Sequence, residues 1–164
     1  MLMKLRAFTL AFVALFSLMS TAHAQLGFSH EVGVVVGPLA FFRNCLDLIK
    51  AAEQPVVAFL SAQVGSIEDN NSGGWYSYRM SKAALNMAVK SLAIECARFK
   101  NHPIVVAIHP GTTRTKLSEP FLKHRKAPVR DAIDSAASIL DLVRGLTPED
   151  SGSFLNTRGE IIPW

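Results

Sequence analysis

Tyr78 and Lys82 lie four residues apart, within a stretch that runs from Gly73 to Asn86. On a helix, side chains at this spacing share one face, one turn apart. A phenol has a pKa of about 10, so it holds its proton too tightly for ready exchange at neutral pH. A neighbouring ammonium group stabilises the phenolate and lowers the pKa of the phenol. The pair therefore predicts a general acid–base role for Tyr78, supported by Lys82.

The spacing alone is a weak signal, since a chance match is expected about one time in ten, and its alternative is an ordinary helix-surface pair. The other tyrosine, Tyr76, has Met80 at the same offset, so only Tyr78 is a candidate. The context strengthens the prediction. An apolar run that ends in Ser61 and a loop rich in glycine, asparagine and serine come before the pair, and a second apolar run follows it.

The elements that must position this pair follow from the apolar pattern. Continuous apolar runs predict buried parallel strands at Val56–Leu60 and Ile104–Ile108. Apolar residues at three- and four-residue steps predict helices at Leu39–Glu53, Trp75–Phe99 and Asp131–Leu146, the first of them opened by Pro38. Shorter strands are predicted at Val32–Val36, Phe154–Leu155 and Ile161–Ile162, and Thr112–Arg130 is predicted to be a loop.

Alternating helices and strands predict an α/β fold with a parallel sheet flanked by helices. Ligands of such sheets bind beyond the carboxyl ends of the strands. We therefore expect the functional loops to follow Leu60 and Ile108.

The segment Tyr78–Asn86, with the sequence YRMSKAALN, resembles the active-site helix of the short-chain dehydrogenases/reductases. The stretches Ser61–Ile67 and Gly73–Tyr76 are similar to the C-factor and sniffer-like carbonyl reductase branch of that family. His109–Thr115 resembles the family's Pro-Gly segment, and Ser151–Trp164 resembles the ending of the same branch. The resemblance covers roughly residues 37–164, and its joint pattern is highly specific. It implies a partial Rossmann-like parallel sheet flanked by helices.

The resemblance implies an oxidoreductase that uses NAD or NADP, with NADP favoured, to reduce a carbonyl or oxidise an alcohol. Tyr78 would exchange the proton, Lys82 would also hold the nicotinamide ribose, and Ser61 would polarise the carbonyl oxygen. The loop 116–130 would cover the substrate. Residues along the cofactor would be Tyr78, Lys82, Pro110, Gly111, Thr113 and Thr115. The helices Leu39–Glu53 and Trp75–Phe99 would form a homo-oligomer interface.

The sequence departs from the family at three places. Ala62 fills the usual position of the catalytic serine, so Ser61 or Ser66 would have to take over. Val34 stands where a proton-relaying asparagine is expected. The glycine-rich phosphate-binding unit is missing, because Gly33 and Gly37 are not followed by a third glycine. We therefore expect the chain by itself to bind the cofactor weakly or not at all, and the inner edge of its sheet to lack a partner strand.

The N-terminus has the layout of a secretory signal peptide. Lys4 and Arg6 precede an apolar run, and Ala22 and Ala24 suit cleavage before Gln25. The predicted organisation is a signal-like segment 1–24, a junction 25–36 and a catalytic half at 37–164. An uncleaved anchor, and a fragment or mis-joined frame, remain open. The leader favours export to the periplasm or medium, whereas the family resemblance favours the cytoplasm; no stable membrane span is expected in the mature chain.

The net charge and the cysteines indicate which kinds of binding partner the chain favours. The net charge is +4, and the basic cluster 123–130 has no interleaved aromatic residues, so it favours a solvated loop over a nucleic-acid surface. A third interpretation is a loop that meets an anionic cofactor or substrate. Cys45 and Cys96 match no metal-ligand spacing, so no metal site is predicted, and a disulfide between them would require export. The expected partner is a small carbonyl or alcohol substrate.

Two further functions stay open beside the reductase. The chain could be a non-catalytic or truncated association module that keeps the family's helix interface. It could also be an exported protein that has reused the scaffold for binding.

Overall fold

The structure is a computed structural model that describes residues 11–14, 29–116, 118–122 and 128–164. Most of the predicted signal-like segment 1–24, the residues 25–28 of the junction and the basic residues 123–126 lie outside these described residues.

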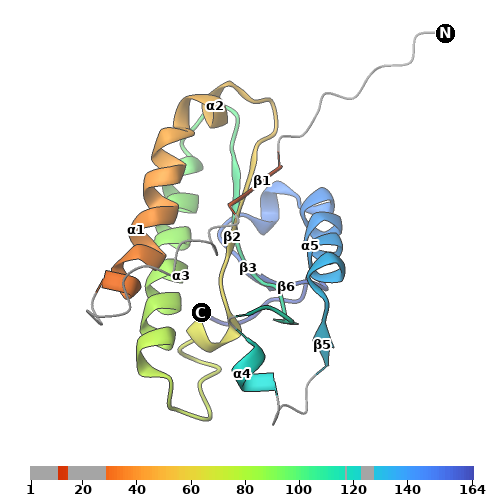
Figure 1. Ribbon diagram of the computed structural model, residues 1–164. Helices are drawn as coiled ribbons and strands as arrows, with labels where there is room; N and C mark the ends of the chain where they lie inside the picture. The colour runs from red at the N-terminus through yellow and green to blue at the C-terminus, as the bar shows by residue number, and fades with distance from the viewer. Residues whose placement is uncertain (1–10, 15–28, 117, 123–127) are drawn as a thin grey trace, which may run out of the picture.

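A parallel four-stranded sheet lies at the centre of the described chain (Figure 1). Its strand order is β1-β2-β3-β6, with bounds Ala11–Ala14, Val56–Leu60, Ile104–His109 and Phe154–Asn156. The long runs predicted as β2 and β3 are confirmed, because every residue in them is buried except the last. Such strands read as unbroken apolar runs, since helices cover both of their faces.

Helices cover both faces of the sheet, as Figure 1 shows: α1 and α3 pack on one face and α5 on the other. The helices are α1 (Ser29–Asn44), α2 (Leu46–Ala51), α3 (Tyr76–Cys96), α4 (Glu119–Leu122) and α5 (Ala132–Gly145). Short 3-10 turns are η1 (Gln63–Gly65) and η2 (Pro148–Asp150), and a separate two-stranded sheet joins β4 (Thr112–Thr113) to β5 (Val129–Arg130). The predicted α/β fold class is confirmed.

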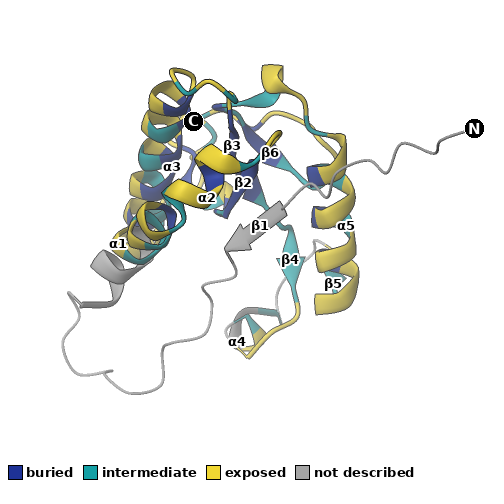
Figure 2. Cartoon of the chain, turned by 90° about the horizontal axis from the view of Figure 1, so that it is seen from above, coloured by how far each residue is buried: buried dark blue, intermediate teal, exposed yellow. Residues whose placement is uncertain are grey.

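The core has two layers, one on each face of the sheet (Figure 2). On one face Phe59, Val105 and Phe154 pack against Leu85 and Val89 of α3. On the other face, the alternate strand residues pack against Ile139 and Val143 of α5. The strands therefore hold their carboxyl ends at a fixed place relative to the first turn of α3.

Two predictions near the N-terminus are wrong. Val32–Val36 is part of helix α1 and not a strand, and α1 begins at Ser29, so Pro38 lies inside the helix and does not open it. The predicted helix Leu39–Glu53 is also two helices, because α1 ends at Asn44 and α2 begins at Leu46. Tertiary packing against α3 outweighs the strand preference of a valine-rich run.

The inner edge of β2, which the sequence predicts to be unpaired, has a partner strand in the structure. Residues Ala11–Ala14 pair in parallel with Val56–Phe59, in the register Ala11 to Val56 and Ala14 to Phe59. The partner comes from the apolar run of the predicted leader. A short apolar segment can form a buried parallel strand or the core of a leader, because the two have the same composition.

The smaller predicted elements are mostly confirmed. Phe154–Leu155 lies in β6, and Ile161 forms an antiparallel bridge to Leu155. The prediction that 112–130 is a loop is only partly right, because the segment contains the short strands β4 and β5 and the four-residue helix α4. None of the helices among the described residues is both long and apolar enough to cross a membrane.

Candidate active site

The candidate active site lies at the carboxyl ends of β2, β3 and β6, where the sequence predicts the ligand to bind. Because these strands are parallel, Ser61, His109 and Asn156 come to the same edge of the sheet. A pocket of about 430 Å³ opens there, and its lining includes Gln63, His109, Gly111 and Asn156.

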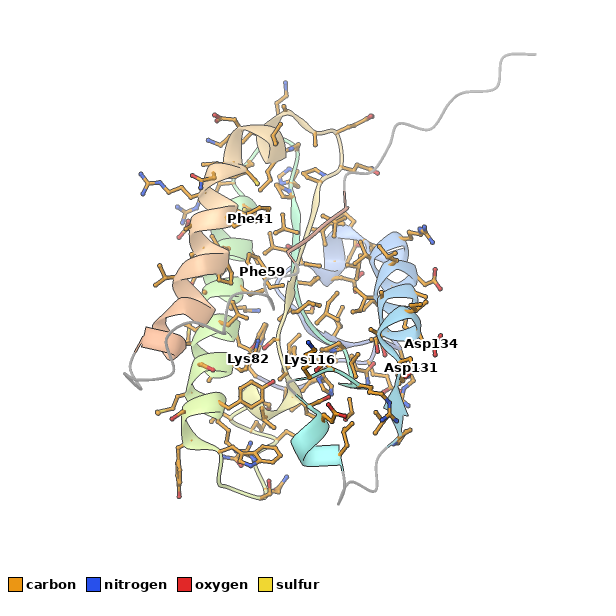
Figure 3. All side chains as sticks on the ribbon, in the orientation of Figure 1. Phe41, Phe59, Lys82, Lys116, Asp131 and Asp134 are labelled. Atoms are coloured by element: carbon orange, nitrogen blue, oxygen red, sulfur yellow. The ribbon has the colours of Figure 1, made fainter. Side chains whose placement is uncertain are left out.

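Lys82 reaches this edge from the second turn of α3. Its Nζ donates a hydrogen bond to the carbonyl oxygen of Leu60, the last residue of β2, at 3.1 Å. Figure 3 shows Lys82 on the side of α3 that faces the sheet. Burial lowers the pKa of Lys82 from its ordinary value of 10.5, because a desolvated ammonium group is less stable than a hydrated one.

Tyr78 lies one turn before Lys82, in the first turn of α3, and is 45% exposed. The tyrosine is therefore accessible to a small molecule while its neighbouring lysine is largely buried. The backbone before it has a special shape, since Gly73, Gly74 and Trp75 all have positive φ angles, of 62°, 67° and 47°. These left-handed residues turn the chain sharply into the helix.

Arg79, to which the sequence assigns no role, holds this turn in place. Its guanidinium donates to the carbonyl oxygens of Gly73 and Gly74, to Val64 O at 3.2 Å and to Ser72 Oγ at 2.9 Å. Four of its five bonds end on backbone carbonyls, which carry no sequence signal. The arginine thereby fastens the loop before α3 to η1, directly beside Tyr78.

Ser61 is 4% exposed, and its Oγ donates to Oδ1 of Asn86 at 2.5 Å. Asn86, another residue to which the sequence gives no role, is 3% exposed and donates from Nδ2 to Gly65 O at 3.3 Å. This network joins the end of β2, the turn η1 and α3. The Ser61 proton is thus directed into the protein, and Ala62, at the family's usual serine position, is buried.

Ser66, the alternative serine, is 2% exposed and serves the loop structure. Its Oγ accepts a hydrogen bond from the backbone N–H of Asp69 at 3.0 Å and donates to Trp164 O at 3.4 Å. In this geometry both of its bonds are to main-chain atoms of the protein.

The predicted cofactor-binding residues after β3 lie in different surroundings, some at the pocket and some bonded to other parts of the chain. Gly111 lines the pocket, and Pro110 precedes it at the strand end. Thr113 lies in β4 and its Oγ1 bonds to Oγ of Ser135 on α5 at 2.8 Å, whereas Thr115 is exposed and bonds to Ser118. Lys116 extends from this segment near the same end of the sheet (Figure 3).

The chain fits the nicotinamide end of a dinucleotide cofactor better than the phosphate end. Gly111 has a φ of 78°, and a methyl group there would meet no heavy atom within 4 Å, so a flat ring could approach its backbone closely. The sequence holds no G-x-G-x-x-G turn to bind a pyrophosphate. The residues present could hold the nicotinamide and its ribose, through Lys82, Pro110 and Gly111.

Both cysteines are free thiols, and burial together with the neighbouring Glu95 raises the pKa of Cys96 to about 11. Neither thiol contributes to the pocket lining.

No family model matches the chain. Among curated proteins, C-signal of Myxococcus xanthus is 35% identical over 129 residues, which cover 79% of this chain and 73% of C-signal. The 1-hydroxy-2-glutathionyl-2-methyl-3-butene dehydrogenase of Rhodococcus is 33% identical over 79% of this chain and 54% of its own length. The chain thus spans about three quarters of C-signal but little more than half of the dehydrogenase.

Solved structures with this fold include carbonyl reductases. The carbonyl reductase Sniffer of D. melanogaster superposes with a TM-score of 0.70 at 29% identity, over 89% of this chain and 63% of Sniffer. The NADPH-bound carbonyl reductase from chicken fatty liver superposes with a TM-score of 0.68 at 26% identity, over 82% of this chain and 55% of the enzyme. On these relatives, the chain belongs to the short-chain dehydrogenase/reductase family.

Proposed function

We propose that this chain is the acid–base half of an NAD(P)-dependent carbonyl reductase. The observation that carries the proposal is the placement of Lys82, one helical turn after Tyr78 and bonded to the last carbonyl of β2. Lys82 thereby lies at the end of the sheet where the pocket opens, although neither Lys82 nor Tyr78 is among the residues that line the pocket. The relatives named as dehydrogenases and carbonyl reductases support the reaction class.

In the proposed reaction Tyr78 gives its proton to the oxygen of the substrate carbonyl. When bound, the nicotinamide cofactor supplies the hydride for the carbonyl carbon. Lys82 holds a positive charge at the strand end, which stabilises the phenolate left on Tyr78. Burial works against this charge, since desolvation lowers the pKa of Lys82 from its ordinary value of 10.5, so the effect requires Lys82 to stay protonated at the working pH.

Ser61 could polarise the carbonyl only by turning its proton away from Asn86. The Ser61–Asn86 bond is short and buried, so its loss would leave the amide oxygen of Asn86 without its donor. We propose that Ser61 acts first as a positioning residue for the end of β2, and that direct contact with substrate requires this bond to open.

The test is a comparison of the two tyrosines, which stand two residues apart at the start of α3. Full-length protein is assayed with NADPH and an aromatic aldehyde, and Tyr78→Phe is expected to lower kcat by about 100-fold or more, because general acid catalysis contributes about 10² to 10⁴. Tyr76→Phe is the matched control, since Tyr76 is 78% exposed and has no lysine at the following turn. Equal loss in both variants, or none in Tyr78→Phe, would refute the proposal.

A second candidate function is a non-catalytic association module. Met80, Met87 and Ile94 recur every seven residues on α3 and are 61%, 68% and 57% exposed, so they form an apolar stripe on one face of the helix. An interface made of this stripe and α1 would bury it in a homo-oligomer. The two functions separate in a fluorescence titration with NADPH: a dissociation constant beyond the millimolar range in an oligomeric protein favours the module.

A further inference from the structure

Four charged side chains line the pocket at the strand ends, and they differ in how their charges are balanced. Arg158 and Glu160 form an ion pair at 2.7 Å. Asp69 accepts a hydrogen bond from Nε2 of Gln63 at 2.7 Å. Arg130 is bonded only to hydroxyl groups, Thr157 Oγ1 at 3.0 Å and Ser138 Oγ at 3.4 Å.

No carboxylate of the described residues lies within 4.0 Å of the Arg130 guanidinium, whose charge therefore has no partner in that part of the chain. A guanidinium group presents several N–H donors in one plane, and it binds a carboxylate through two parallel hydrogen bonds. Both recorded bonds of Arg130 use Nη1, which leaves other donors of the fork for a ligand.

The position of Arg130 is set in advance by three elements. Its backbone belongs to β5, which pairs with β4, and its carbonyl oxygen accepts a bond from Arg114 N at 2.8 Å. Its side chain is held by Ser138 of α5 and by Thr157 in the turn after β6. A charge fixed in this way loses little conformational freedom when it binds an anion.

The place of Arg130 in the sheet bears on which anion it meets. Thr157 follows β6, the outer strand in the order β1-β2-β3-β6, whereas the phosphate-binding unit of the family would join the sheet from the opposite side, beyond β2. Arg130 itself pairs through its backbone with Thr113, one of the residues expected along the cofactor, so the charges of the pocket decide between a phosphate and a carboxylate.

We infer that the substrate is a carbonyl compound that carries a carboxylate, and that Arg130 binds this carboxylate at the outer wall of the pocket. That this compound is reduced rests on the proposed function, whereas the binding of its carboxylate by Arg130 does not. A carboxylate fits better than a phosphate, because Asp69 and Glu160 also line the pocket and would repel a doubly charged group.

The test is a binding titration of the full chain with two probes, benzoylformate and its methyl ester, which differ in one negative charge. Binding is followed by NMR chemical shifts of backbone amides around the pocket, without cofactor. The acid is expected to bind at least 10-fold more tightly than the ester. Arg130→Met should abolish this difference, and Arg130→Lys should retain part of it, because an ammonium group keeps the charge but not the planar fork.

Arg144→Met is the matched control, since Arg144 is an α5 arginine with an ion pair to Asp141 and lies outside the pocket lining. It should keep the full preference for the acid. Equal affinity for the two probes, no measurable binding of either at millimolar concentration, or an unchanged preference in folded Arg130→Met would each overturn the inference. A failure of NADPH to bind would count against the proposed function alone, because these titrations use no cofactor.

Discussion

At the scale of single residues, the site depends on how Lys82 and Ser61 are held. Lys82 is fixed to the end of β2 by one hydrogen bond, and Ser61 is fixed to α3 by another. Both bonds join the strand to the same helix, so the spacing between the strand end and Tyr78 is controlled from two sides. Tyr78, the proposed acid–base group, is thereby held on a rigid element, as proton transfer would require.

The roles of Tyr78 and Lys82 could be proposed from the sequence, because their chemistry is visible in their types and spacing. Arg79 and Asn86 lie in the same stretch and were missed. Their partners are backbone carbonyls and a serine 25 residues away, and no local pattern predicts such bonds. The bonding of Arg130 to hydroxyl groups could not be predicted either, because its partners Ser138 and Thr157 belong to two other parts of the fold.

At the scale of elements, the contact between η1 and α3 is the tightest near the site. Gly65 packs so closely on the helix that a methyl group there would lie 2.6 Å from Cβ and 2.8 Å from the carbonyl carbon of Lys82. Only glycine fits at this point, because any side chain would push η1 away from the helix. The network from Ser61 through Asn86 to Gly65 O lies beside this contact.

Gly65→Ala is therefore expected to displace Lys82 and to destabilise the fold by about 1 to 3 kcal/mol, the usual cost of overpacking. Gly37→Ala is the matched control: a methyl group there meets no atom within 4 Å, and alanine favours the helix by about 1 kcal/mol over glycine. Urea unfolding followed by circular dichroism measures both. A Gly65→Ala protein as stable as the wild type would contradict the packing described for η1 and α3.

The strands at the centre could be predicted and the N-terminal elements could not. Val56–Leu60 and Ile104–Ile108 are unbroken apolar runs, the pattern that buried parallel strands produce. Val32–Val36 carries the same strand preference but lies in α1, because its place in the fold is set by packing. Ala11–Ala14 lies in a stretch that also suits a leader, and its pairing with β2 has no local signal.

At the scale of the whole molecule, β1 extends the sheet beyond β2 and becomes its edge strand. It pairs with four of the five residues of β2, and helix α1 connects the two parallel strands. The strand protects backbone groups of β2 that would otherwise be open at an apolar edge. Open edges of this kind pair with other chains.

A chain that begins at Gln25, the predicted cleavage product, lacks β1 and should self-associate more strongly than the full chain. We expect its mass, measured by light scattering after size-exclusion chromatography, to rise with concentration over a range in which the full chain stays constant. A Val13→Pro variant of the full chain is a second test, because proline removes a backbone donor from the strand. If the shortened chain and the full chain have the same concentration dependence, β1 does not protect the edge.

The central claim is that Lys82 makes the proton of Tyr78 easier to remove, and the chain allows a direct measurement because it has only two tyrosines. In Tyr76→Phe protein, tyrosinate absorbance near 295 nm reports Tyr78 alone. Adding Lys82→Met should raise the midpoint of this titration by about 1 to 3 pH units, the effect of removing an opposite charge nearby. Burial lowers the pKa of Lys82 from its ordinary value of 10.5, and the lysine loses its charge as the pH rises, so the two proteins are expected to differ most at the lower end of the titration. Identical midpoints with and without Lys82, in proteins shown to be folded, would contradict the account.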